Sequence, residues 1–175
     1  SGVLGYDLWS LCQQGPEGDL GATERTQPAM LAAGVATWRV WLQHGGPMPV
    51  AMAGHSLGEY TALVCSRALD FRVAVDLVRF RGQAMQRAVP LGEGAMAAVL
   101  GLEDSVVEEL CEQIEGVWPA NYNCPGQIVV SGENEAVDKL IAEAAARGSR
   151  KTVKLRVSGG FHSPLVADAA KPFAA

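Results

Sequence analysis

The chain has 175 residues, of which 49% are hydrophobic, so it is long and apolar enough to bury a core as one domain or two small ones. This composition excludes intrinsic disorder, because disordered chains have too little apolar surface to bury. The formal net charge of -5 argues against a protein that binds nucleic acid, which needs a basic surface to neutralise phosphates.

The first elements that the pattern predicts are a helix and a strand. Apolar residues recur at helical spacing over 27–43, with Thr26 as the expected N-cap and Pro28 in the first turn. Residues 49–54 then form a short apolar run after a Gly-Gly-Pro turn, which is typical of a strand buried on both faces.

Two more helices follow the expected strand. One starts at once, over 56–64, and the other covers 71–88 with Asp70 as its N-cap. The second helix carries an apolar stripe and is stopped by Pro90, because proline cannot continue a helix.

The pattern of apolar residues changes after Gly92. Strands are expected at 95–102, 117–123, 127–131 and 152–157, and helices at 104–114 and 134–147. This βαββαβ order is typical of a ferredoxin-like fold. We therefore predict an α/β protein with a ferredoxin-like subdomain, residues 93–157, inserted into a larger α/β body formed by residues 1–92 and 158–175.

The cysteines and the ends of the chain bear on its location. The four cysteines form no C-x-x-C pair and no histidine lies at metal-ligand spacing, so we expect reduced thiols and no metal site. No run reaches the roughly 18 apolar residues of a membrane span, and no signal-peptide pattern is present. We expect a cytoplasmic protein without membrane contact.

The chain starts at Ser1 without methionine and stops in an interrupted helical pattern, so we expect it to be incomplete.

A G-x-S-x-G motif, residues 54–58, lies between the expected strand and the next helix. In this context the motif forms a nucleophile elbow, which exposes the hydroxyl of Ser56 on a sharp turn. The N–H groups at the start of the helix, that of Leu57 first, would face a developing oxyanion. The structural alternative is that Ser56 is an ordinary helix N-cap.

A serine nucleophile needs a base, and the chain has three histidines. His55 is adjacent to Ser56 and points elsewhere at a sharp turn, while His44 follows a helix as a terminal residue favoured by the helix dipole. His162 lies at a loop-to-helix junction after Gly159 and Gly160, which suits a base reaching across a cleft. The alternative is a histidine in a surface loop.

Arg81 interrupts the apolar stripe of the helix over 71–88, because it lies four residues after Leu77 and four before Met85. An inward guanidinium is costly without an anion. The partner could be an internal carboxylate, or the side chain could reach outward to solvent. It could also be a substrate carboxylate, which a guanidinium binds in a bidentate manner.

Four ordered segments resemble the malonyl-CoA:acyl-carrier-protein transacylase family and the related acyltransferase domains of fatty acid and polyketide synthases. They are GHSLGEY at 54–60, RGQAMQ at 81–86, NYNCPGQ at 121–127 and FHS at 161–163. The resemblance implies Ser56 as nucleophile, His162 as base, Arg81 as the clamp for the malonyl carboxylate, Leu57 N–H as an oxyanion donor and Asn121 near the site. It also implies a hydrolase-like parallel-sheet body with the ferredoxin-like subdomain.

The resemblance further implies malonyl-CoA and acyl carrier protein as partners, a coenzyme A thioester as substrate, and no cofactor. Family members begin with a strand and a glutamine-bearing, glycine-rich segment, and they extend beyond position 175. Because both parts are missing here, we expect the 175-residue chain alone to be inactive or unstable. A serine thioesterase or other hydrolase with the same elbow, a polyketide-synthase acyltransferase domain and a non-catalytic module remain alternatives. The choice between malonyl and methylmalonyl groups also stays open.

Overall fold

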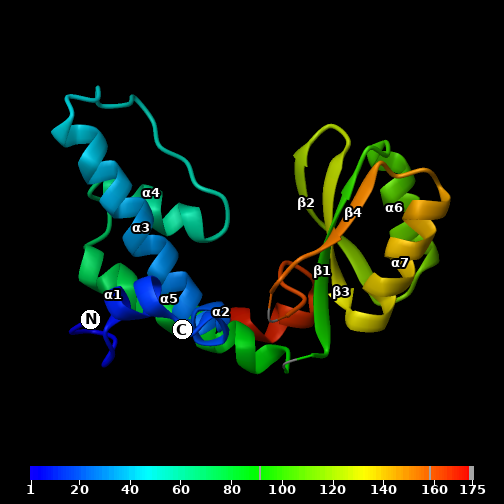
Figure 1. The fold of residues 1–175 in the computed structure, drawn as a ribbon, viewed down its shortest axis with the longest axis horizontal. Helices are drawn as coiled ribbons and strands as arrows, with labels where there is room; N and C mark the ends of the chain where they lie inside the picture. Colours follow the sequence, from blue (N-terminus) through cyan, green and yellow to red (C-terminus); the bar gives the residue numbers. More distant parts are fainter. Residues whose placement is uncertain (91, 158, 174–175) are drawn as a thin grey trace. The chain divides into compact units, whose positions relative to one another are not determined.

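The computed structural model describes residues 1–90, 92–157 and 159–173. The chain divides into two compact units, Ser1–Gln83 and Ala84–Ala175, which are drawn together in Figure 1 and described separately below. The predicted domain boundaries stay a prediction, and residues 91, 158, 174 and 175 of those domains lie outside the described residues.

The first unit is helical (Figure 1). Its helices are α1 (Leu8–Gln14), α2 (Glu17–Gly21), α3 (Thr23–Gln43), α4 (Leu57–Cys65) and α5 (Phe71–Ala88), the last of which continues into the second unit. Apolar residues of α1, α3, α4 and α5 meet in a core whose fully buried members include Leu31, Ala74 and Val78. Burying a side chain of the size of leucine stabilises the unit by about 1.5–3 kcal/mol.

Helix α3 begins earlier than the sequence predicts. The expected N-cap, Thr26, lies inside the helix, which starts at Thr23 with Ala22 as N-cap. The hydroxyl of Thr26 donates to the carbonyls of Leu20 and Ala22 instead of capping a free N–H. The prediction failed because threonine satisfies its hydroxyl equally well within a helix, by bonding a carbonyl of the preceding turn.

The strand predicted at 49–54 is wrong. The segment has no regular secondary structure and no strand pairing, and Val50 is fully exposed. A strand exists only where a neighbour accepts and donates its backbone hydrogen bonds, and the first unit contains no strand that could do so. The apolar run therefore predicted neither pairing nor burial here, because both depend on a partner that local sequence does not supply.

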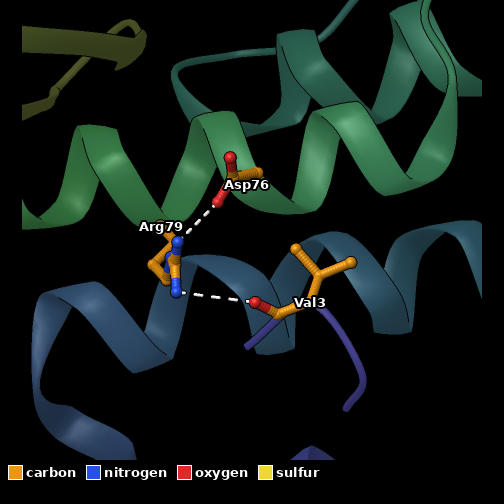
Figure 2. A network of polar contacts seen from close by, with 3 residues as sticks. All are labelled: Val3, Asp76 and Arg79. Atoms are coloured by element: carbon orange, nitrogen blue, oxygen red, sulfur yellow. Dashed lines mark hydrogen bonds and ion pairs between the residues drawn. The ribbon is translucent and has the colours of Figure 1, made fainter. Parts of the chain in front are cut away.

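Helix α5 confirms the predicted cap and shows how the N-terminal segment is held. The carboxylate of Asp70 accepts from the N–H groups of Arg72 and Val73 at 2.8 and 3.1 Å, as an N-cap does. Arg79 donates to Asp76 one turn earlier at 2.6 Å and to the carbonyl of Val3 at 3.5 Å (Figure 2). These contacts connect the start of the chain to α5.

The second unit is a four-stranded antiparallel sheet covered on one face by two helices (Figure 1). Its elements are β1 (Gly94–Leu100), α6 (Asp104–Gln113), β2 (Val117–Cys124), β3 (Gln127–Glu133), α7 (Asn134–Ala146), β4 (Lys151–Lys154) and the 3₁₀ helix η1 (Pro164–Phe173). The strands lie in the order β2-β3-β1-β4. Apart from the terminal 3₁₀ helix, the predicted βαββαβ order is confirmed, and β4 ends three residues earlier than expected.

The core of this unit lies between the sheet and helices α6 and α7. It includes Ala97 and Val130 from the sheet with Val137 and Leu140 from α7, all of them at 0% exposure. Alternate residues of β1 and β3 supply this core because successive strand side chains point to opposite faces. Among the described helices, none combines the length and the apolar character needed to cross a bilayer.

Candidate active site

Ser56 lies on a strained turn immediately before α4. Its backbone has φ 52° and ψ -115°, a conformation that residues with a side chain rarely adopt. Gly54 makes this turn possible, because a Cβ at that position would lie 1.9 Å from the carbonyl group of Gly58. The geometry is that of a nucleophile elbow, although the segment before it is not a paired strand.

The start of α4 offers donors next to this hydroxyl. Helix α4 begins at Leu57, whose N–H belongs to the first turn and so has no intrahelical acceptor. The next two N–H groups, of Gly58 and Glu59, bond to the carbonyls of His55 and Ser56 at 2.8 and 3.2 Å. The N–H of Leu57 thus lies in the first turn of α4, and its role as an oxyanion donor stays a prediction.

Arg81 reaches Ser56 from α5. Its Nη2 donates to the Oγ of Ser56 at 3.1 Å, and its Nη1 donates to the Oε1 of Gln27 at 2.8 Å. The guanidinium also lies 5.9 Å from the ring centroid of Tyr60, which is within cation–π range. The structure thus brings together two residues that are 25 positions apart in sequence.

The contacts of Arg81 bear on the alternatives left open by the sequence, and its role as a substrate clamp stays a prediction. In the described part of the chain no carboxylate lies within ion-pair distance of it, and the side chain is half-buried instead of extended into solvent. Desolvation lowers the pKa of Arg81, and the nearby Tyr60 and Glu59 partly oppose this shift. A guanidinium still keeps its proton in a protein, so a positive charge with neutral hydrogen-bond partners lies beside Ser56.

An apolar cleft of about 1100 Å³ opens beside the elbow. It is bounded by α3, by the start of α4 and by the irregular segment before Ser56, and Trp38, Trp41 and Met52 contribute to its wall. Ser56 lies in the lining of this mostly apolar cleft, so its hydroxyl is one of the few polar groups there.

His162 belongs to the second unit, in the loop before η1. Its side chain is exposed, and its backbone has φ 59°, the left-handed conformation. The loop is held on both sides of it: the hydroxyl of Ser163 donates to the carbonyl of Gly160 at 2.6 Å, and Phe161 packs on Met85 and Ala169. The structure therefore confirms the predicted loop-to-helix junction of His162, while its role as a base stays a prediction.

Asn121 also belongs to the second unit, on strand β2. The register of β2 against β3 shifts between Pro119 and Asn121, as at a β-bulge. Proline has no N–H to donate and is tolerated here because β2 is an edge strand. Such shifts re-aim the following side chain and are frequent beside active sites. Asn121 is half-buried, and its placement near the nucleophile stays a prediction.

Sequence reasoning missed Gln27. This residue is 6% exposed, and it is one of the few polar side chains buried in the described part of the chain. A signal was available: the expected apolar face of the helix over 27–43 begins with an amide beside Pro28, where a hydrophobic residue would pack without needing a partner. Among the described residues, no cluster of metal-ligating side chains is found at the site or elsewhere.

The site geometry agrees with the sequence family that matches this chain. The family described as "Acyl transferase domain" matches residues 2–175. The chain belongs to this family. A malonyl CoA-acyl carrier protein transacylase from Escherichia coli O157:H7 is 52% identical over 177 residues, which cover 99% of this chain and 57% of that protein.

Solved structures give the same relationship for this acyl transferase domain. The malonyl CoA-acyl carrier protein transacylase from Coxiella burnetii has a TM-score of 0.94 and 50% identity, covering 99% of this chain and 56% of that chain. A malonyl-transacylase solved in complex with a type II PKS acyl-carrier protein has a TM-score of 0.93 and 49% identity, covering 99% and 57%. The acyl transferase domain thus spans little more than half the length of these relatives.

Proposed function

We propose that the intact protein transfers a malonyl group from malonyl-CoA to the phosphopantetheine thiol of acyl carrier protein, in fatty acid biosynthesis, through a malonyl-Ser56 intermediate. Family membership supports acyl transfer, and the relatives that resemble the chain along 99% of its length are named for malonyl transfer to the carrier. The observation that carries the choice of acyl group is the hydrogen bond from Arg81 to Ser56.

That hydrogen bond limits the size as well as the charge of the acyl group. Because Nη2 of Arg81 lies 3.1 Å from the nucleophilic Oγ, a carboxylate that pairs with the guanidinium must be close to the carbonyl under attack. In a malonyl thioester one methylene separates these two groups. A longer dicarboxylic acyl group would have to fold back, and an uncharged one would leave the guanidinium without an anion.

The proposed reaction has two displacement steps. His162 takes the proton of Ser56, the Oγ attacks the malonyl thioester carbonyl, and the Leu57 N–H stabilises the oxyanion. The carbon–sulfur bond breaks, coenzyme A leaves as a thiol with the proton from His162, and the malonyl ester of Ser56 remains. The carrier thiol then gives its proton to His162 and attacks the ester. The bond between the acyl carbon and Oγ breaks, and Ser56 takes the proton back from His162.

The proposed function also concerns Asn121, the fold of each unit, the need for a cofactor and the location of the protein. Asn121 lies near the site, the first unit belongs to a hydrolase-like body, and the second forms the ferredoxin-like subdomain. The reaction needs no cofactor, since Ser56 supplies the nucleophile and His162 the proton transfers. A cytoplasmic location fits the free thiols of the four cysteines.

Mass spectrometry of the intact protein mixed with malonyl-CoA tests the covalent step. A malonyl adduct is expected on the peptide that contains Ser56, and Ser56→Ala should abolish it. The adduct should disappear when acyl carrier protein with its phosphopantetheine arm is added, with the malonyl group recovered on the carrier. An unlabelled Ser56 in a folded protein would refute the proposal.

Substitution of Arg81 separates malonyl transfer from the hydrolase alternative. Arg81→Ala is expected to lower kcat/KM for malonyl-CoA by about 100-fold, the loss typical of a bidentate charged contact, while acetyl-CoA is used as well as before. Steady-state rates with the two thioesters measure this. Equal losses with both would favour a hydrolase that does not read the carboxylate.

A further inference from the structure

The buried amide of Gln27 stands out because it is not one of the groups that react. It lies on α3 at 6% exposure, and the side-chain oxygen accepts from Nη1 of Arg81 at 2.8 Å. A guanidinium has donors only, so the amide oxygen and not the amide nitrogen must face it. The amide orientation is therefore set by chemistry.

Gln27 and Ser56 engage different nitrogens of the same guanidinium. Nη1 bonds to Gln27 and Nη2 bonds to Ser56, so the guanidinium plane is held at two points. Acylation converts the hydroxyl of Ser56 into an ester, and one of the two points then changes. The bond to Gln27 is independent of the state of the nucleophile.

The close crossing of α3 and α5 brings Gln27 to Arg81. Gly82, next to Arg81, touches the start of α3 so closely that a Cβ would lie 2.6 Å from the Cα of Glu24 and 2.7 Å from the carbonyl oxygen of Thr23. Gln27 follows Thr23 by one helical turn and therefore lies on the same face of α3. The backbone thus supports the contact between the two side chains.

From this geometry we infer that Gln27 is a positioning residue, which aims the Arg81 guanidinium at the acyl group on Ser56 without neutralising its charge. This role rests on the proposed malonyl transfer. A carboxylate in place of the amide would also hold Arg81, but it would compete with the substrate carboxylate for the guanidinium. A neutral acceptor orients the cation and leaves its charge for the substrate.

Three variants of the intact enzyme test this role. Gln27→Met keeps the length of the side chain and removes the acceptor, and Gln27→Glu keeps the shape and adds the competing charge. Gln43→Met makes the first change at an exposed position at the other end of α3 and is the matched control. Rates with malonyl-CoA and with acetyl-CoA are measured for each, together with the thermal midpoint.

Gln27→Met should lower kcat/KM for malonyl-CoA by about 10-fold or more, the range for a lost hydrogen bond to a charged group, mainly through KM. Use of acetyl-CoA should stay within a few-fold of the unsubstituted enzyme, and Gln27→Glu should lose more malonyl activity than Gln27→Met. The Gln43→Met control should match the unsubstituted enzyme with both thioesters.

Equal losses with malonyl-CoA and acetyl-CoA would show that Gln27 supports only the fold, and an unchanged malonyl preference in both variants would refute the positioning role. Full malonyl activity in Gln27→Glu alone would refute the need for a neutral acceptor. Arg81→Ala in the same assay separates the two proposals. If it spares the malonyl preference, the proposed function fails, whereas loss in Arg81→Ala without loss in Gln27→Met overturns only the role of Gln27.

Discussion

The contact between Gly54 and Gly58 gives a sharp test of the elbow. In Gly54→Ala the added Cβ would lie 1.9 Å from the carbonyl of Gly58, whereas real Cβ contacts are essentially never shorter than 3.0 Å, so the two segments must separate by at least 1.1 Å. Ser56 lies between them on its strained turn and must move with them. A displacement of about 1 Å at a reacting group costs on the order of 100-fold in rate.

A fluorophosphonate probe, which reacts with activated serines, measures the consequence. Labelling of Ser56 in the Gly54→Ala variant of the intact protein should slow by about 100-fold, and overpacking should lower the stability by about 1–3 kcal/mol. Gly58→Ala is the matched control, because nothing lies within 4 Å of an added Cβ there and alanine favours the helix. Labelling of Gly54→Ala as fast as that of Gly58→Ala would refute the steric account.

Three further predictions concern the second unit. Leu140→Ala, at a position with 0% exposure, should lower the free energy of unfolding by about 2–5 kcal/mol in urea titrations. The hydrogen bond to Glu108 raises the pKa of Tyr122 to about 12, so Glu108→Gln should return the ultraviolet titration of Tyr122 towards 10. The raised pKa stabilises the fold at neutral pH, and this contribution is lost as pH rises through 12. Burial raises the pKa of Cys111 to about 12, so a thiol reagent should modify the exposed Cys124 in the folded protein and Cys111 only after unfolding.

The predicted elements that succeeded are those in which local pattern and tertiary environment agree. The βαββαβ order was predictable because each strand and helix of the second unit has its own periodicity and is bounded by turn residues. Asp70 was predictable as an N-cap because the cap forms with the two or three residues that follow it. The segment at 49–54 failed for the opposite reason, since pairing of a strand requires a neighbour elsewhere in the chain.

Local sequence was enough to predict the candidate site residues: an elbow motif around Ser56, a helical arginine within an apolar stripe, and a histidine at a loop junction. The contacts of Arg81 depend instead on tertiary packing. The packing of α5 on α3 and α4 places its guanidinium between Gln27 and Ser56, which lie 54 and 25 residues away. Helical periodicity predicts that a side chain points inward, but the atoms that it meets belong to other helices. The approach of those helices depends on a close contact such as that at Gly82.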